Sequence, residues 1–200
     1  MSIHLRTGIA EDAAAIHGLV SANLNAGHLL PRSLADVREH AQRFIVAVEQ
    51  DDDGEHVIGC AELAPLSESV AEVRSLVVDE ARRGRHTGVA LVTALADRAR
   101  TVGYVTLCAF THQPSHFVRL GFSIVPHQWL PEKIAHDCAG CSQFRQCGQY
   151  AVSLSLRAGS GVRLAEGVGA APRVVAPRRA SVERLRLVPI ATDEAERVPA

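Results

Sequence analysis

A strand that runs into a basic, glycine-containing turn and then into a long helix is the feature that most constrains this chain. Residues 70–78 (VAEVRSLVV) predict a strand, and residues 87–103 (TGVALVTALADRARTVG) have apolar residues at helical spacing with a glycine stop. Between them, residues 83–88 (RGRHTG) hold two arginines, one histidine and two glycines. Glycines let a backbone approach a ligand, and the free N–H groups of a helix N-terminus attract anions. The turn therefore predicts a site for an anion such as a pyrophosphate, with Arg83 and Arg85 adding positive charge.

The remaining periodic segments extend this unit into one α/β domain. Apolar residues at helical spacing predict helices at 11–24, 33–42 and 114–121, and alternating or continuous apolar runs predict strands at 3–6, 43–50, 56–63, 104–110, 122–125 and 149–156. An Asp-Gly pair in residues 51–55 predicts a hairpin turn. The order β-α-α-β-β-β-α-β-α-β-β predicts a mixed sheet with helices on both faces.

The amino-acid composition of the chain changes after Leu156. Residues 157–200 are rich in Gly, Pro, Ala and Arg, contain no aromatic residue, and hold eight Arg against five acidic residues. Such a composition predicts a disordered tail. We therefore expect a folded domain at residues 1–156 and a disordered Arg/Ala/Pro-rich tail at residues 157–200.

Charge and hydropathy exclude several classes of protein. The formal net charge is −1, so a dedicated nucleic-acid binder is not expected. No apolar run approaches the roughly 20 residues that cross a membrane, and residues 1–12 lack the layout of a signal peptide. With five cysteines, an odd number, a disulfide framework is not expected either. We expect a cytoplasmic protein without a membrane partner.

The basic turn, its context and the later segment RLGF (residues 119–122) resemble the GCN5-related N-acetyltransferase (GNAT) superfamily over about residues 2–156. The phosphate loop of that superfamily reads Arg/Gln-x-x-Gly-x-Gly/Ala, and Arg83, His86 and Gly88 fall on its three fixed positions. His86 thus stands where the superfamily has its first glycine. The resemblance implies the GNAT fold, with a mostly antiparallel mixed sheet, and acetyl-CoA as the acetyl donor.

The same resemblance implies which residues contact coenzyme A. Backbone amides of the turn would hold its pyrophosphate, and the strand before the turn would pair with its amide-rich pantetheine arm, which enters where the fourth and fifth strands splay apart. The expected set is Leu76, Val77, Val78, Arg83, Gly84, Arg85, His86, Thr87, Gly88 and Val89. No metal is assigned. A homodimer is possible, because members of the superfamily are often dimers.

Three further stretches, at residues 29–47, 59–66 and 117–133, resemble the acetyltransferase domain of N-acetylglutamate synthase in its short form. In that family an Arg-Ser pair before the second helix lies beside the amino-acid substrate, and here the pair is Arg32 and Ser33. Arg32 would bind a carboxylate with two parallel hydrogen bonds. The alternative is a surface arginine and a serine that only caps the helix.

Glu72 and Arg74 lie on one face of the strand that leads into the turn, because side chains on a strand alternate. Arg74 would bind a second carboxylate, and Glu72 would accept the amine proton directly or through a water. The alternative is an internal Glu72–Arg74 pair beside the cleft. Phe117 takes the place of the tyrosine acid found in many members of the superfamily, as in the synthase branch, so the chemistry would rest on placement and on backbone N–H groups that stabilise the oxyanion.

The segment before the last strand departs from the two-domain synthases, which carry a basic stretch there that contributes to the glutamate site. Arg145 is a candidate substitute. Three cysteines spaced C-x2-C-x5-C (Cys138, Cys141 and Cys147) follow His136, and three thiolates with an imidazole suit zinc, although free thiols in a short loop explain them as well. The other two, Cys60 and Cys108, are expected to be structural, and His112 and His116, near the expected thioester end, are given no role.

Three hypotheses follow from these observations. The first is an acetyl-CoA-dependent N-acetyltransferase that acts on the α-amine of a free amino acid, with L-glutamate and arginine biosynthesis as the specific expectation. The second keeps the chemistry but changes the acceptor to another small amine or a protein amino group. The third is a non-catalytic acetyl-CoA-binding module with a sensing role.

Overall fold

A computed structural model describes residues 2–24, 29, 31–52, 54–141 and 144–157. The chain divides into a unit of residues 1–163 and another of residues 164–200, and every described residue belongs to the first. The predicted tail lies outside the described residues, apart from Arg157.

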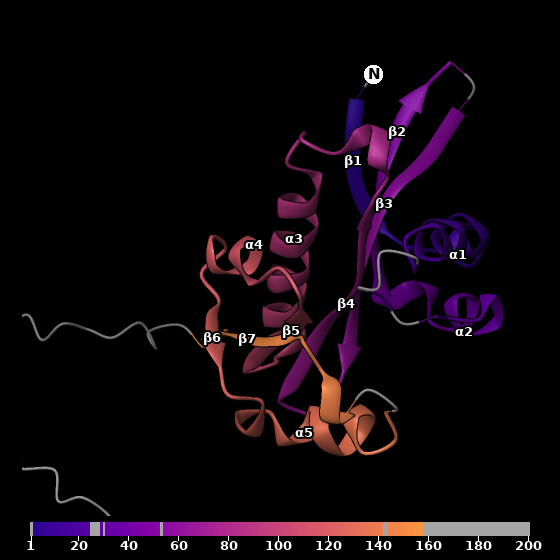
Figure 1. The fold of residues 1–200 in the computed structure, drawn as a ribbon. Coiled ribbons are helices and arrows are strands. Elements are labelled where there is room, and N and C mark those ends of the chain that lie inside the picture. Colours follow the sequence, from indigo (N-terminus) through magenta and orange to yellow (C-terminus); the bar gives the residue numbers. More distant parts are fainter. Residues whose placement is uncertain (1, 25–28, 30, 53, 142–143, 158–200) are drawn as a thin grey trace, which may run out of the picture. The chain divides into compact units, whose positions relative to one another are not determined.

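One mixed sheet organises this unit (Figure 1). Its strands run in the order β1-β2-β3-β4-β5-β7-β6, and every neighbouring pair is antiparallel except β4 and β5. The strands are β1 (Ser2–Thr7), β2 (Phe44–Asp51), β3 (Gly54–Pro65), β4 (Val70–Val78), β5 (Thr106–Thr111), β6 (Ser123–Val125) and β7 (Tyr150–Ser155). The helices are α1 (Ala13–Ala22), α2 (Leu34–Glu39), α3 (Thr87–Val102), α4 (Pro114–Val118) and α5 (Pro131–Lys133). The predicted element order and the mixed, mostly antiparallel sheet are confirmed.

The alternation of β2 explains why helices cover both faces of the sheet. Ile45 and Ala47 pack into the core that contains α3, whereas Phe44, Val46 and Val48 pack against α1 and α2. Because successive side chains point to opposite faces, a strand with apolar residues at every position is buried on both sides. Figure 1 shows α3 on one side of the sheet and α1 and α2 on the other.

The ends of the helices follow local chemistry. The Ser33 side chain caps α2 by accepting a hydrogen bond from the Asp36 backbone N–H, 3.1 Å away. Gly103 ends α3 with a positive φ of 102°, which glycine adopts without strain. The expected hairpin is also present, since Asp51 pairs with Gly54 across the turn.

One part of the chain has more structure than the sequence predicted. Residues 131–138 form α5 followed by a π-helical turn, Ile134–Cys138, before the last strand. This segment brings Lys133 and Asp137 against β4. No helix within the described ranges is both long enough and apolar enough to span a bilayer.

Candidate active site

The parallel pair β4 and β5 separates after the first three residues of β4. The strands are paired only at Val70, Ala71 and Glu72 of β4, and beyond Glu72 no pairing with β5 continues. The remainder of β4, residues 73–78, therefore has an unpaired edge toward β5, with backbone groups available for an extended ligand. This is the expected splay.

A β-bulge lies on the same half of β4. Arg74 pairs with Glu62 of β3 and Val77 pairs with Cys60, so Ser75 and Leu76 together face Ala61. Ser75 has a φ of 50°, a left-handed conformation that is rare outside glycine. A bulge disrupts the ladder and re-aims side chains, and bulges often adjoin active sites. Here it places Val77 on the same face as Arg74, against α1.

The turn after β4 has the backbone that the glycine pattern predicted. Gly84 has a φ of 83°, and His86 caps α3 in the left-handed region with a φ of 60°. The histidine in place of a glycine is thus accommodated in a conformation that costs roughly 1–2 kcal/mol for a residue with a Cβ. The first N–H groups of the 16-residue helix α3 begin at Thr87, so the donors expected to bind an anion are in place.

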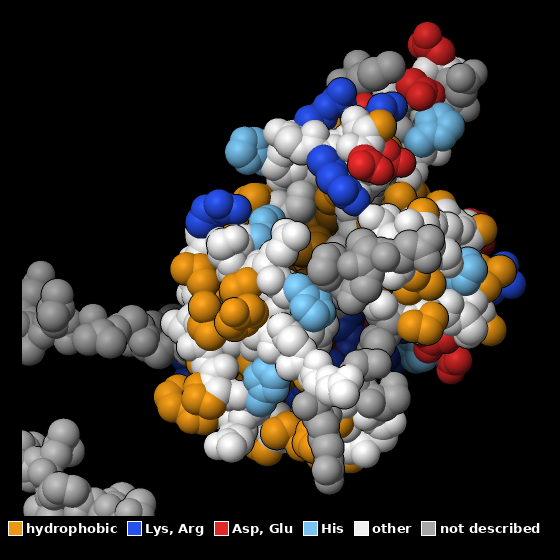
Figure 2. All heavy atoms as spheres, viewed as in Figure 1, with side chains coloured by type: hydrophobic (Ala, Val, Ile, Leu, Met, Phe, Trp, Pro, Cys, Tyr) orange, Lys and Arg blue, Asp and Glu red, His pale blue; other side chains and the backbone are white. Residues whose placement is uncertain are grey.

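The arginines of this turn are engaged by other parts of the protein. Arg82 and Arg85 bind the two oxygens of Glu49, at 2.7 and 3.2 Å, and Glu49 is buried. Arg83 donates to the Val78 carbonyl at 3.2 Å and to Asn23 Oδ1 at 2.8 Å. Other basic and acidic side chains lie close together on the surface at the top of Figure 2. Glu49 neutralises part of the charge that the sequence offers here.

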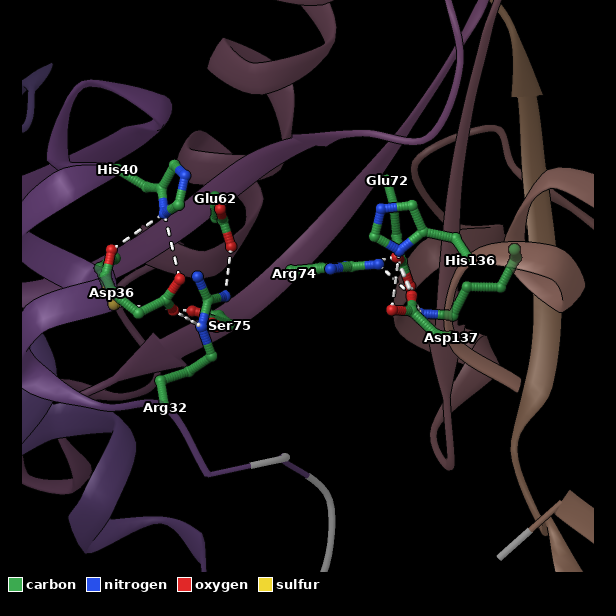
Figure 3. A network of polar contacts seen from close by, with 11 residues as sticks. Arg32, Asp36, His40, Glu62, Glu72, Arg74, Ser75, His136 and Asp137 are labelled. Carbon is green, nitrogen blue, oxygen red and sulfur yellow. Dashed lines mark hydrogen bonds and ion pairs between the residues drawn. The ribbon is translucent and has the colours of Figure 1, made fainter. Parts of the chain in front are cut away.

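A first ion-pair cluster surrounds Arg32, just before α2 (Figure 3). Its Nε donates to Asp36 and its Nη1 to Glu62, both at 2.5 Å, and Glu62 is 1% exposed. His40 Nδ1 lies 3.1 Å from Asp36 Oδ1. Burial opposes ionisation of Asp36, but the bonds from Arg32 and His40 outweigh it and lower the pKa of that carboxyl. Arg32 thus lies between two acids, and Nη2 is the guanidinium nitrogen that takes no part in these two ion pairs.

A second cluster surrounds Glu72 and Arg74. Arg74 donates its Nε to Glu72 at 2.5 Å and its Nη2 to Asp137. Lys133 Nζ lies 2.7 and 2.8 Å from the two oxygens of Glu72 and 2.8 Å from Asp137. Burial opposes ionisation of Asp137, but the bonds from Lys133 and His136, together with Arg74, lower the pKa of that carboxyl. The internal Glu72–Arg74 pair anticipated as the alternative is present.

The two clusters belong to one face of the sheet. Glu62 and Arg74 are directly opposite each other on β3 and β4, and Glu72 is two residues before Arg74. Their neighbours Ala61, Leu63, Ala71 and Val73 point the other way, into the core beneath α3. The structure therefore brings Arg32, Arg74 and Glu72 together beside the splay, whereas Ser33 is exposed and serves as the cap of α2.

Sequence reasoning missed four charged members of this site: Asp36, Glu62, Lys133 and Asp137. Glu62 interrupts an apolar strand and Lys133 is the sole lysine of the chain, which are the signals that could have identified them. The side chain of Arg145, the candidate substitute for a basic segment, lies outside what the structure describes. Within the described ranges no group of three or more His, Cys, Asp or Glu side chains is placed to hold a metal ion.

A cavity of about 300 Å³ lies at another place, where β4 and β5 begin. Its lining includes Trp129, Glu132 and Ser153, and it contains none of the site residues expected from the sequence. The candidate site is therefore defined by the splay, the bulge and the ion pairs.

Comparisons with known proteins agree with this geometry. Residues 16–122 match the model of the Acetyltransferase (GNAT) family. A Chlorobaculum tepidum protein described as an uncharacterized N-acetyltransferase is 30% identical over 152 residues, which cover 76% of this chain and 96% of that protein. The amino-acid acetyltransferase of Mycobacterium tuberculosis is 33% identical over 120 residues, covering 60% of this chain and 67% of the relative.

Solved structures show the same fold. A Mycobacterium tuberculosis protein in complex with CoA and NLQ is 27% identical, with a TM-score of 0.65, and the match covers 77% of this chain and 99% of that one. N-acetylglutamate synthase from Neisseria gonorrhoeae, complexed with coenzyme A and N-acetyl-glutamate, has a TM-score of 0.68 at 22% identity and supports the fold alone. The match covers 79% of this chain but only 36% of the synthase.

Proposed function

Since this chain belongs to the GNAT acetyltransferase family, we propose that it transfers the acetyl group of acetyl-CoA to the α-amine of a free amino acid, with L-glutamate as the specific candidate. The observation that carries the proposal is the position of Arg32 and Arg74, which lie on one face of the sheet beside the splay of β4 and β5. A pathway role in arginine biosynthesis belongs to the glutamate candidate and depends on it.

The residues present fit acetyl-CoA. The unpaired half of β4 suits an amide-rich arm, which can pair with a strand edge as a peptide does. Gly84, His86 and the first turn of α3 suit a diphosphate. Bound there, acetyl-CoA supplies an activated thioester. The bulge at Ser75 and Leu76 would offer backbone N–H groups to the oxygen of that thioester as negative charge develops on it.

The acceptor site carries both signs of charge, as an α-amino acid does. Arg32 Nη2 and Arg74 Nη1 are the guanidinium nitrogens not used in the ion pairs described above, and each would donate to a carboxylate. Glu62 and Glu72 are the buried carboxylates nearest these arginines in the sheet and would attract the ammonium group. Arg32 and Arg74 thus orient the acceptor, and the acids draw its amine toward β4.

Proton transfer would involve Glu72. The amine must lose a proton to attack, and Glu72 would take it directly or through a water. Both Glu72 oxygens are bonded to Lys133, and one is also bonded to Arg74, so the carboxylate is held in one orientation. Phe117 cannot donate a proton to the departing thiolate, and we assign that proton to solvent. The ammonium group loses two protons in all, the first to Glu72 before attack and the second once the C–N bond has formed. As the C–S bond breaks, the thiolate takes one proton from solvent, so the whole reaction releases one proton.

A second acceptor class is favoured by the charge count. The clusters contain Asp36, Glu62, Glu72 and Asp137 against Arg32, Arg74 and Lys133, so four acids face three cations. A net charge of −1 disfavours a second carboxylate on the acceptor and favours a neutral or basic side chain. Such an acceptor would keep the fold and chemistry but remove the link to N-acetylglutamate.

The test is thiol release from acetyl-CoA by the full chain against glutamate, glutamine, neutral and basic amino acids and a polyamine. Turnover with glutamate alone supports the synthase function. Turnover with uncharged or basic amino acids supports the second class, and turnover with the polyamine or a peptide amine rejects a free amino acid. If acetyl-CoA binds but no amine turns over, the protein is a binding module rather than an enzyme.

Arg32→Ala tests the assignment of the acceptor site. We expect the KM for the amino acid to rise roughly 10- to 100-fold, because a hydrogen bond to a charged group contributes about 1.5–3 kcal/mol, while the KM for acetyl-CoA stays constant. Arg38→Ala, which changes an exposed arginine on the adjoining helix α2, is the matched control. An unchanged amino-acid KM in Arg32→Ala would remove Arg32 from the acceptor site.

A further inference from the structure

His116 on α4 contains a buried polar atom that the fold does not satisfy. Its Nε2 has no hydrogen-bond partner among the described residues, although the residue as a whole is only half-buried. A buried polar atom without a partner destabilises a protein, and each instance in a native structure calls for an explanation. The proposed mechanism does not use this side chain.

The imidazole lies against the first turn of α3. A Cβ built on Gly88 would be 3.7 Å from His116 Cε1 and 3.8 Å from Nε2. Gly88 is the second residue of α3 and belongs to the turn that we assign to the diphosphate of acetyl-CoA. The ring therefore covers the end of α3 where that ligand would bind.

A second unsatisfied atom lies on the same turn. Thr87 is 5% exposed, and its Oγ1 likewise has no partner among the described residues. Thr87 precedes Gly88 in the first turn of α3, the turn that the His116 ring contacts, so among the described residues this turn and the α4 side chain packed on it each carry a buried polar atom without a partner. Two such atoms associated with one helical turn point to groups kept for a ligand rather than for stability.

Packing alone does not account for a histidine at this position. His116 makes an edge-to-face contact with Phe117 at 5.5 Å between ring centroids, and a phenyl ring would make the same contact. Burial, with the neighbouring charge of Arg119, lowers the pKa of His116. The ring is therefore neutral near pH 7 and can present one N–H donor.

We propose that His116 is a coenzyme-binding residue whose ring turns on binding, so that Nε2 donates a hydrogen bond to an oxygen of acetyl-CoA beside the first turn of α3. This inference rests on the proposed function and adds a residue to its donor site. This hydrogen bond gives His116 Nε2 the partner that it lacks in the free protein. Binding therefore removes the free-energy cost of the unsatisfied nitrogen, and that gain adds to the affinity for the coenzyme. His116 then has opposite effects on the stability of the free protein and on affinity for the coenzyme.

The test compares the full chain with His116→Phe by calorimetric titration of coenzyme A without any acceptor, and by thermal unfolding without ligand. We expect the Kd to rise about tenfold, as for loss of a hydrogen bond to a charged group, and the Tm to stay the same or rise because the unsatisfied nitrogen is gone. Ser115→Ala, an exposed change on the same helix, should alter neither value. An unchanged Kd in His116→Phe overturns the inference.

A second variant decides the case in which His116→Phe lowers both Tm and affinity. His116→Gln restores a nitrogen donor at this position. Recovery of most of the affinity by His116→Gln supports the hydrogen bond, whereas weak binding by both variants shows a structural role and overturns it. If the unchanged protein fails to bind coenzyme A, the proposed function itself fails, which is a separate result from loss of binding in the variant alone.

Discussion

Removal of the Lys133 charge should strongly destabilise the fold, because Lys133 compensates acids that the sheet buries. Its Nζ lies within 2.8 Å of both Glu72 oxygens and of Asp137, and the exposed fractions of the Lys133 and Glu72 side chains are 10% and 4%. In Lys133→Met, Arg74 would be left to compensate Glu72 and would share Asp137 with His136. Deleting one partner of a buried ion pair costs about 3–5 kcal/mol.

That cost is measurable at neutral pH by urea unfolding and by thermal unfolding, each followed by circular dichroism. For a domain of roughly 150 residues, 1 kcal/mol shifts Tm by about 2–4 °C, so Lys133→Met should unfold about 6–20 °C lower. The double variant Lys133→Met, Glu72→Gln removes both charges and should regain most of the lost free energy of unfolding.

A surface pair provides the matched control. Arg100 and Asp97 lie 2.8 Å apart on α3, and their side chains are 46% and 68% exposed. Exposed pairs contribute about 0–1 kcal/mol, so Arg100→Met should change the free energy of unfolding by less than that. If Lys133→Met cost no more than Arg100→Met, the cluster around Glu72 would be a solvated surface network that does not hold Glu72 in place.

Two other predictions concern thiols and acid. Burial raises the pKa of Cys60 to about 12 and also raises that of Cys108. At pH 8 a maleimide or iodoacetamide should therefore modify only the other three cysteines of the native protein, and all five after unfolding, as mass spectrometry would show. Rapid labelling of Cys60 in the native state would contradict its burial. Burial opposes ionisation of Asp12, but two bonds from Arg6 outweigh it and lower the pKa of the carboxyl. The stability contributed by Asp12 is complete above its unfolded pKa, near 4, and is lost as pH falls through the lower folded pKa. Asp12→Asn should therefore flatten the acid limb of a plot of urea midpoint against pH. Parallel acid limbs for the two proteins would contradict the lowered pKa of Asp12.

The elements predicted best were those whose periodicity is strong and whose ends carry local signals. β4 matches residues 70–78, and α3 ends at Gly103 as the glycine indicated. The segment at 131–138 escaped prediction because it is too short to show a period and because its partners are distant in sequence. Lys133 bonds to Glu72, which lies 61 positions earlier in the chain. Such contacts require the register of the sheet, which no local pattern contains.

The sequence predicted the backbone of the candidate site more fully than the ion-pair partners of its charged side chains. The glycine pattern indicated the tight turn, and the alternation of β4 placed Glu72 and Arg74 on one face. The sequence did not reveal that Arg32 is bonded to Glu62, 30 positions later, or that Arg85 is bonded to Glu49, 36 positions earlier. An arginine met in a sequence is taken as a free cation, whereas in the fold its charge is shared with acids from neighbouring strands.

This sharing bears on how the site would bind an acceptor. An arginine on a flexible stem loses conformational entropy when it binds a carboxylate, and fixing it beforehand lowers that cost. Asp36 and Glu62 hold Arg32 by two of its nitrogens, and Glu72 and Asp137 hold Arg74 in the same manner. Each guanidinium is thereby oriented with one nitrogen remaining, so the acids reduce the net charge of the site but increase its geometric precision. A lysine at either position would keep the charge and lose the paired orienting bonds, because an ammonium group lacks the planar fork of donors. With these four acids, the site would recognise an acceptor through the geometry of its hydrogen bonds more than through its net charge. Such recognition suits a small zwitterion whose amine must reach the splayed edge of β4 in one orientation.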